Sequence, residues 1–555
     1  MKPTKAVILC GVLFVLASCK KKKDPPPVVT PMSLTTWSIT NNSNKLLTYY
    51  DAPVAASVRF RFNAPVKRST VTGMVTMTNA GGGNISCNIS YEASDSVIVL
   101  KPASNLSFLT KYKVSLVNNI TSAAGGSLLA GTEITLYTSI DSSRKFPVIS
   151  DNSLLDLVQQ QTFKYFWDFG HPVSGLARER NSSGDIVTSG GSGFGIMAMV
   201  TGVSRNFITR AQGLTRMQTI VSFLKNTAQK FHGAFPHWLN GATGTVVPFS
   251  TKDNGADLVE TAYLMEGLLC ARQYFNDPGV PETNLRNDIN TIWNGVEWDW
   301  FRHGGQNVLY WHWSPDYNWD MNMPIRGWNE CLITYVMAAS STTHGVPAAV
   351  YAQGWTGNGS AGFTNGGTYN GVVLPLGPAG GGPLFFEHYS FMGIKPVGLT
   401  DAYANYQTQT VNHSRINYEY CRSNPNSWFG YSDSVWGLTA SDIQNGYTAS
   451  SPTNDIGTIA PTAALSSFPY TPTESMKALK YFYYVLGDKI WGDYGFYDAF
   501  NLKDLWFANS YLAIDQGPII VMIENYRSGL LWNLFTSCPE VKSGMLSLGF
   551  SAPYL

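Results

Sequence analysis

Residues 471–487, TPTESMKALKYFYYVLG, carry the pattern of one complete amphipathic helix. Thr471 and Glu474 have the spacing of a capping box, and Pro472 stands at the first helical position. Apolar side chains then recur at steps of three or four, and Gly487 follows as a predicted stop. The apolar positions of this helix are Met476, Leu479, Tyr483 and Leu486.

The same helical period recurs on both sides of this helix, after about residue 150. Between residues 150 and 540 we count about ten to twelve such segments, separated by loops rich in Gly, Trp, Tyr and Asn. Paired helices on this scale predict a mainly α domain, an (α/α)6 toroid with a cleft at one end, over residues 150–540. Two further segments show the period at Leu155, Val158, Thr162, Tyr165 and Phe169, and at Leu214, Met217, Val221, Leu224, Ala228 and Phe231.

Residues 33–142 have a different, two-residue period. Short alternating runs at residues 58–62, 97–100, 111–116 and 132–137 are separated by clusters of Gly, Asn, Ser and Pro. Several short strands at this spacing predict a small β-sandwich. The phrases SVRFRFNAPV and VIVLKPASNLSFLTKYKVSL also resemble bacterial Ig-like domains. A spacer or sugar-binding accessory role suits such a domain.

Composition excludes two classes of protein. The 555 residues include 38 Lys and Arg against 37 Asp and Glu, and this formal net charge of +1, without basic blocks, lacks the electrostatic signature of a nucleic-acid binder. A 13% aromatic content, with 16 Trp, excludes intrinsic disorder. Many aromatic and Gly residues with few charges suit a protein that handles an uncharged polar ligand.

The N-terminus has the features of an export signal. Lys2 and Lys5 precede an apolar run at residues 6–16 that is too short to span a bilayer. The following Leu-Ala-Ser-Cys resembles a lipobox, which predicts a signal peptide at residues 1–18 and acylation of Cys19. Residues 19–32 then form a charged, Pro-rich tether. We expect an envelope lipoprotein of the outer membrane, facing the periplasm or the surface; an ordinary signal peptide with an incidental Cys is the alternative.

The remaining cysteines indicate neither a zinc site nor a nucleophile. They occur singly, without CxxC or framework spacing, and their odd number leaves at least one thiol unpaired within the chain. These are Cys87, Cys270, Cys331, Cys421 and Cys538.

An acidic stretch, KDNGADLVE at residues 252–260, is the strongest functional signal. On a helix, Asp253, Asp257 and Glu260 would lie within about 60° of one another. Like charges on one face destabilise a helix by a few tenths of a kcal/mol per pair, so three acids on one face need a functional reason. We therefore expect this stripe to face a polar ligand cleft. Helix capping would explain Asp253 and Asp257 at less cost, but it explains Glu260 poorly.

Two further carboxylates fit the roles of a proton donor and a base. Glu330 opens a helix behind an aromatic run, where its pKa would be raised, as a general acid requires. Asp515 is expected just before a helix that begins at Pro518, where the partial positive charge would keep it ionised. Such a pair is what inverting glycoside hydrolysis uses, although either acid could instead be a structural cap.

Loops near these acids supply candidate sugar contacts. Asp455, Asp498 and Glu387 could bind hydroxyl groups, and aromatic rings could stack on sugar faces. A single aromatic residue more often packs in the core than contacts a ligand, so the prediction of sugar binding rests on the cluster of aromatic residues. The candidate rings are Trp311, Trp313, Trp328, Phe386, His388, Tyr389, Tyr447, Tyr497 and Trp506.

Six long motifs resemble glycoside hydrolase family 144. They are KDNGADLVETAYLMEGLL, MPIRGWNECLITYVMAAS, GPLFFEHYSFMGI, NDIGTIAPTAALSSFPYTPTESMKALKYFY, YGFYDAFN and YLAIDQGPIIVMIENYRSGLLW, in order over residues 150–540. The resemblance implies an (α/α)6 barrel that cleaves β-1,2-linked glucan or its oligosaccharides with anomeric inversion, without a metal or cofactor. It implies that Glu330 is the general acid and that Asp253, Asp257 and Glu260 line the cleft. Asp515 is the preferred base and Asp257 the reserve.

Two other functions remain open on the sequence. A non-catalytic glycan-binding envelope lipoprotein would use the same aromatic cleft. A polysaccharide lyase would need clustered basic residues where these motifs carry acids. Endo cleavage and exo release of sophorose, the β-1,2 disaccharide, are not distinguished.

Overall fold

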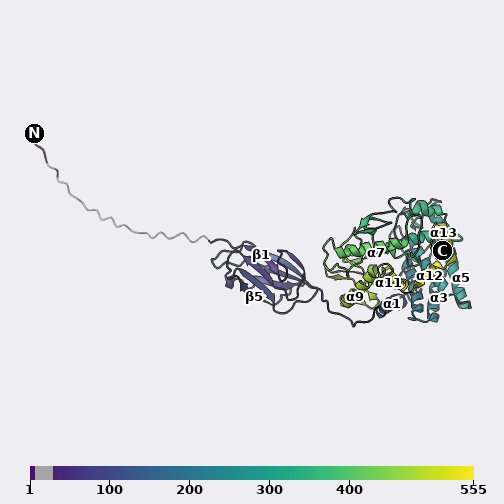
Figure 1. Cartoon of the computed structure of the whole chain (residues 1–555), viewed down its shortest axis with the longest axis horizontal. Coiled ribbons are helices and arrows are strands. Elements are labelled where there is room, and N and C mark those ends of the chain that lie inside the picture. The colour runs from purple at the N-terminus through teal and green to yellow at the C-terminus, as the bar shows by residue number, and fades with distance from the viewer. Residues whose placement is uncertain (5, 7–28) are drawn as a thin grey trace. The chain divides into compact units, whose positions relative to one another are not determined.

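The computed structural model describes residues 1–4, 6 and 29–555, so most of the predicted signal peptide, and Cys19, lie outside the described residues. The chain divides into two compact units, Met1–Ile140 and Asp141–Leu555. In Figure 1 the strands of the first unit are purple to blue, and the helices of the second unit run from blue through green to yellow. Among the described residues, no helix has the length and apolarity that a membrane span requires.

The first unit contains two four-stranded sheets, ordered β1-β3-β6-β5 and β2-β8-β7-β4, in which β2 and β8 are parallel and the other pairs antiparallel. The predicted alternation is confirmed in β3, where Val58, Phe60 and Phe62 are buried between outward-facing arginines. The apolar faces of the two sheets share one core. The strands are β1 (Leu34–Ile39), β2 (Thr48–Ala52), β3 (Val58–Phe62), β4 (Val75–Asn79), β5 (Cys87–Glu92), β6 (Val97–Pro102), β7 (Lys111–Leu116) and β8 (Thr132–Thr138).

The second unit is mainly helical, as its periodicity predicts. Its longer helices are α1 (Asp151–Trp167), α2 (Ser189–Ser204), α3 (Arg210–Asn226), α4 (Leu258–Tyr274), α5 (Val280–Asn294), α6 (Leu332–Ser340), α7 (Tyr406–Ser423), α9 (Pro472–Tyr484), α11 (Ala513–Arg527) and α13 (Pro539–Ser547). Shorter ones are α8 (Pro461–Leu465), α10 (Gly487–Ile490) and α12 (Leu530–Thr536). Two-stranded ribbons lie between them, including β12 (Ala256–Asp257) with β13 (His312–Trp313) and β16 (Ala440–Ile443) with β17 (Gly446–Ala449).

Helix α2 is buried and packs against α4 and α11. Every residue from Ser189 to Val203 is buried, although the segment holds several glycines that disfavour an isolated helix. Close packing explains the glycines: a Cβ on Gly193 would lie 2.1 Å from the carbonyl oxygen of Tyr263 in α4. Tertiary contact therefore stabilises a helix that propensity alone would not predict.

Helix α9 forms where the sequence predicts it, but its ends differ from the prediction. Thr471 is the N-cap residue without making a capping hydrogen bond, so the predicted capping box is wrong. Its hydroxyl donates instead to the carbonyl oxygen of Ser467, in the preceding turn. Gly487 does not end the helical region either, because α10 begins there.

Candidate active site

A cavity of about 440 Å³ lies at one end of the helical unit, where four helices begin. Thr188 is the N-cap of α2, Glu260 lies in the first turn of α4, Glu330 precedes α6, and Leu512 is the N-cap of α11. Unpaired N–H groups and aligned peptide dipoles make helix N-termini favourable places for carboxylates. The cavity thus has two acids, Glu260 and Glu330, at the beginnings of helices.

The acids of residues 253–260 meet in space, but they do not form a helical stripe. Helix α4 begins only at Leu258, so Asp253 lies in the preceding loop and Asp257 is the N-cap residue. The Oδ1 atom of Asp257 accepts hydrogen bonds from the backbone N–H groups of Val259 and Glu260, at 3.0 and 2.9 Å. The predicted stripe is therefore corrected: capping explains Asp257, and Glu260 alone of the three lines the cavity.

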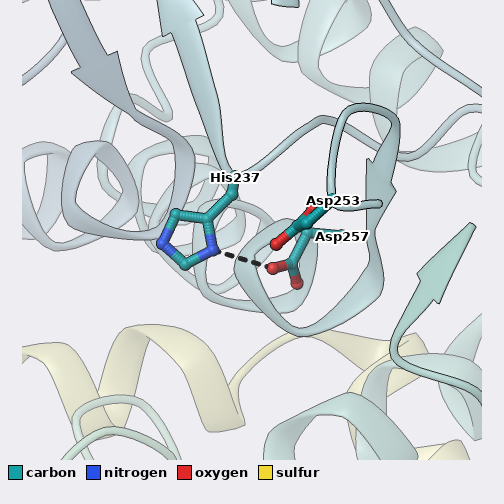
Figure 2. Close-up of side chains that lie close together, drawn as sticks. All are labelled: His237, Asp253 and Asp257. Carbon is teal, nitrogen blue, oxygen red and sulfur yellow. Dashed lines mark hydrogen bonds and ion pairs between the residues drawn. The ribbon is translucent and has the colours of Figure 1, made fainter. Parts of the chain in front are cut away.

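His237 completes this acidic cluster from the segment just before β10 (Trp238–Asn240). Its Nδ1 atom is hydrogen bonded to Oδ2 of Asp257 (dashed line in Figure 2) at 2.9 Å, and its Nε2 atom lies 4.0 Å from Oε1 of Glu260. Burial would lower the pKa of His237, but the charges of Glu260, Asp257 and Asp253 outweigh it and raise the pKa to about 9. The imidazole is consequently a cation at neutral pH.

The two acids beside His237 have opposite pKa shifts. Burial opposes ionisation of Asp257, yet the hydrogen bond from His237, with the charge of His312, lowers the pKa of Asp257. Burial raises the pKa of Glu260, and the charge of Asp257 adds to the effect. The Oε2 atom of Glu260 accepts hydrogen bonds from the backbone N–H of Gly190 at 2.7 Å and from the Thr188 hydroxyl at 3.2 Å. Its other oxygen atom, Oε1, lies 4.0 Å from Nε2 of His237, and the Glu260 side chain lines the cavity.

Glu330 lines the cavity, as the sequence predicts. Burial raises the pKa of its carboxyl group to about 7, and the charges of Asp257 and Glu260 act in the same direction. Its backbone carbonyl oxygen accepts hydrogen bonds from Ser390 and Tyr263, which fix the chain just before α6. A carboxyl group with this pKa holds a proton near neutrality and can still release it.

Asp515 does not have the environment that the sequence predicts. Helix α11 begins at Ala513, so Asp515 lies in its first turn and Pro518 inside it. The side chain is buried against Asp498, and burial together with the charge of Asp498 raises the pKa of Asp515. Burial likewise raises the pKa of Asp498, to about 7. The expected environment of Asp515 is therefore corrected: burial and the neighbouring carboxyl group raise its pKa, and Asp515 is absent from the cavity lining.

Several predicted sugar contacts are buried structural residues instead. Glu387 is fully buried, and its Oε1 atom accepts hydrogen bonds from Trp328 at 3.0 Å, Gln409 at 2.7 Å and His413 at 2.9 Å. His388 is also buried, and burial lowers its pKa to about 3. These three predictions, Trp328, Glu387 and His388, are therefore corrected: their side chains build the core next to the site.

Asp455 and Trp313 also serve packing. Asp455 accepts hydrogen bonds from the side chains of Trp428 at 2.6 Å and Tyr431 at 2.8 Å. Trp313 packs edge-on against Trp300. Phe386, Asp498, Tyr497 and Trp506 are likewise absent from the cavity lining, whereas Trp311, Tyr389 and Tyr447 belong to it.

Sequence reasoning missed other lining residues because it searched for acids and aromatic runs. Arg180 is one: it donates to Glu179 through Nε, at 2.9 Å, and to Asp442 through Nη1, at 3.2 Å. Phe249 is another: it is 51% exposed, and its ring is tilted against the His237 ring with the two centroids 4.2 Å apart. A single His within the aromatic phrase AFPHWL was the available signal for His237.

The geometry of His237, Asp253 and Asp257 also bears on metal binding. One donor atom from each lies within 4.8 Å of the other two, a spacing that a cation could bridge. The same spacing is explained by a protonated His237. The carboxylates raise the pKa of His237 to about 9, and its imidazole is hydrogen bonded to Asp257. We therefore describe the cluster as a charged hydrogen-bond network.

Comparisons with known proteins show which families this chain is similar to. Residues 322–539 match the family model described as "Putative glucoamylase", and residues 28–138 match that of the bacterial Ig-like domain. The exo β-1,2-glucooligosaccharide sophorohydrolase of Parabacteroides distasonis is 46% identical over 424 residues, 73% of this chain and 58% of that protein. The chain thus spans less than two thirds of the length of this curated relative.

Two solved structures extend the comparison. The endo-β-1,2-glucanase of Chitinophaga pinensis, in complex with sophorotriose and glucose, is 52% identical, with a TM-score of 0.72 over 74% of this chain and 100% of its own. A β-1,2-glucanase of P. distasonis is 36% identical, with a TM-score of 0.71 over 94% of this chain and 74% of its own. Matches of this identity, spread over the whole helical unit, show common descent. The chain belongs to glycoside hydrolase family 144, and a bacterial Ig-like domain precedes its helical unit in the sequence.

Proposed function

We propose that this protein is an inverting glycoside hydrolase that cleaves β-1,2-glucan or β-1,2-glucooligosaccharides, either within the chain or by releasing sophorose. The observation that carries the proposal is Glu330, whose carboxyl group has a pKa of about 7 and lines the 440 Å³ cavity together with Glu260. The activities of the relatives above supply the linkage. Neither endo nor exo action is favoured, because relatives of both kinds match.

In the proposed reaction, Glu330 donates its proton to the glycosidic oxygen as the bond from that oxygen to the anomeric carbon breaks. A water molecule attacks the opposite face of the sugar ring and passes its proton to the acid cluster of Asp257, His237 and Glu260. We assign this proton to the cluster as a unit, since its members titrate together. The product anomer is inverted.

The charges of the cavity favour a hydrolase over a lyase. A lyase acting on uronates needs several cations to hold a carboxylate substrate. Arg180 is the one Arg or Lys among the described residues that line this cavity, and Glu179 and Asp442 already neutralise it. A neutral glucan fits this balance of charges.

The test is a time course on linear β-1,2-glucan with NMR detection of the anomeric proton. We expect new reducing ends whose first-formed anomer is α, with soluble starch left intact. Absence of any product from the β-1,2-glucan would refute the function. A first-formed β anomer would refute inversion alone.

We also propose that residues 150–540 form an (α/α)6 toroid. The pairing of α2 with both α4 and α11, and the shared end at which these helices begin, support this arrangement. The domain boundaries that we propose are 33–142 for the Ig-like domain and 150–540 for the hydrolase domain.

For the N-terminus, we propose acylation at Cys19 and attachment to the outer membrane, on its periplasmic or external face. The lipobox and the charged tether support the proposal. Labelling cells with a fatty acid tests it: the wild-type chain should carry label, and the Cys19→Ala variant should not.

A further inference from the structure

The two nitrogen atoms of His237 have different surroundings. The ring is held in place by Asp257, 2.9 Å from Nδ1, and by contact with the tilted ring of Phe249 (Figure 2 shows the bond to Asp257). Nε2 has no hydrogen-bond acceptor among the described residues, since Oε1 of Glu260, at 4.0 Å, lies beyond hydrogen-bond range. The His237 side chain is 24% exposed and lines the cavity, so Nε2 is accessible to a ligand.

The 4.0 Å gap between Nε2 and Oε1 has the size for one shared oxygen atom. An oxygen about 2.9 Å from Nε2 and about 2.7 Å from Oε1 makes normal hydrogen bonds to both. These three lengths close a triangle with roughly a right angle at the oxygen. A hydroxyl group or a water molecule fits this angle, because each can accept one hydrogen bond and donate another.

The charges around His237 set the direction of these hydrogen bonds. Since its pKa is raised to about 9, both ring nitrogens carry protons at neutral pH, and Nε2 acts as a donor. Glu260 offers an oxygen acceptor on the other side of the gap. The charged groups that face His237 are Asp253, Asp257, Glu260 and His312, and the cavity adds Glu179, Arg180 and Glu330.

We propose that His237 and Glu260 together bind one hydroxyl oxygen in the cavity, with Nε2–H of His237 donating to it and Oε1 of Glu260 accepting from it. The oxygen belongs either to a sugar hydroxyl of the glucan or to the attacking water. This inference rests on the proposed function, and it makes His237 a ligand-contacting residue as well as a partner of Asp257.

Two variants separate the roles of the two nitrogens. In His237→Gln the amide nitrogen can occupy the place of Nε2, so the donor into the cavity is kept and the bond to Asp257 is lost. In His237→Asn the amide nitrogen can occupy the place of Nδ1, so the bond to Asp257 is kept and the cavity donor is lost. His344→Asn is the matched control, since His344 pairs with Asp299 at 3.1 Å in another His–Asp pair, at the surface.

The experiment measures kcat and KM of each variant on β-1,2-glucooligosaccharides, with thermal midpoints to confirm folding. We expect His237→Asn to lose about tenfold to a hundredfold in kcat/KM, the effect of one charge-assisted hydrogen bond. His237→Gln should keep several-fold more activity than His237→Asn, and His344→Asn should match the wild type. If folded His237→Asn is as active as His237→Gln, or more active, the inference is overturned.

Binding measurements distinguish the two sources of the oxygen. Oligosaccharide affinity is measured by titration in the Glu330→Gln background, with and without His237→Asn. Weaker binding assigns the oxygen to a sugar hydroxyl, whereas unchanged binding with a lower kcat assigns it to water. A wild-type chain without turnover would refute the proposed function and this inference together; active wild type with the reversed order of variants refutes the inference alone.

Discussion

At the scale of single residues, Glu330 combines a position in the cavity with a raised pKa. Replacing it with Gln keeps the shape of the side chain and removes the transferable proton. We expect kcat on β-1,2-glucan to fall by roughly 10²–10⁴-fold, the usual contribution of a general acid. Turnover assays, with circular dichroism to verify folding, test this. Near-normal turnover in a folded Glu330→Gln variant would remove Glu330 from the mechanism.

The pH dependence of the reaction follows from the same carboxyl group. A general acid acts in its protonated form, and the pKa of Glu330 is raised to about 7 by burial. Activity should therefore fall as the pH rises through about 7, by tenfold per pH unit well above it. A pH profile of kcat/KM measures this limb, and residual activity of Glu330→Gln should not show it. A wild-type rate that stays level to pH 9 would contradict the assignment.

Glu387 provides the opposite case, a residue that we predicted to bind sugar and that the structure buries. Removing its carboxylate by Glu387→Ala leaves Trp328, Gln409 and His413 without their acceptor. Buried donors left unpaired cost about 1–3 kcal/mol each, so we expect the free energy of unfolding to fall by at least about 2 kcal/mol. Urea unfolding measures the loss. A raised KM with unchanged stability would restore a substrate-binding role.

At the scale of elements, the contact between α2 and α4 positions the site. Both Gly193 and Gly267 stand where the helices touch, and a Cβ on either would lie 2.1 Å from a backbone oxygen of the other helix. We expect Gly193→Ala to separate the helices, lower stability by about 1–3 kcal/mol and reduce kcat, because Glu260 and Tyr263 of α4 line the cavity. Thermal unfolding and turnover measure both effects.

Gly362→Ala is the matched control for this prediction. The nearest atom to a Cβ at Gly362 is 4.0 Å away, an ordinary contact. It should leave stability and turnover unchanged. Equal behaviour of the two alanine variants would show that close helix packing is not required.

At the scale of the whole molecule, the two units have separate cores. The cavity is lined by residues of the second unit only. We therefore expect residues 141–555, expressed alone, to fold and to cleave short β-1,2-glucooligosaccharides with kcat/KM within about twofold of the full chain. Parallel assays of both chains measure this. A large loss on short substrates would give the Ig-like domain a direct part in catalysis.

The division into a strand-rich and a helical region can be predicted from the sequence, since residue periods of two and of 3.6 are local patterns. Glu330 and the acids at residues 253–260 could also be predicted from the sequence as candidate site residues, because acids placed beside apolar helical segments destabilise them unless they have a function. The sequence pattern placed Asp257 in a stripe, although the helix begins one residue later, because an N-cap and a first turn look alike in a short acidic run.

Which loop residues face the cavity depends on contacts between distant parts of the chain and could not be predicted from local pattern. His237 meets Asp257 across 20 positions of chain, and Glu387 joins Trp328 across 59, so neither contact has a local signature. The same polar and aromatic residue types occur in the core and at the cavity. Their roles depend on long-range packing, which sets the burial that raises the pKa of Asp515 and leaves Nε2 of His237 open to a ligand.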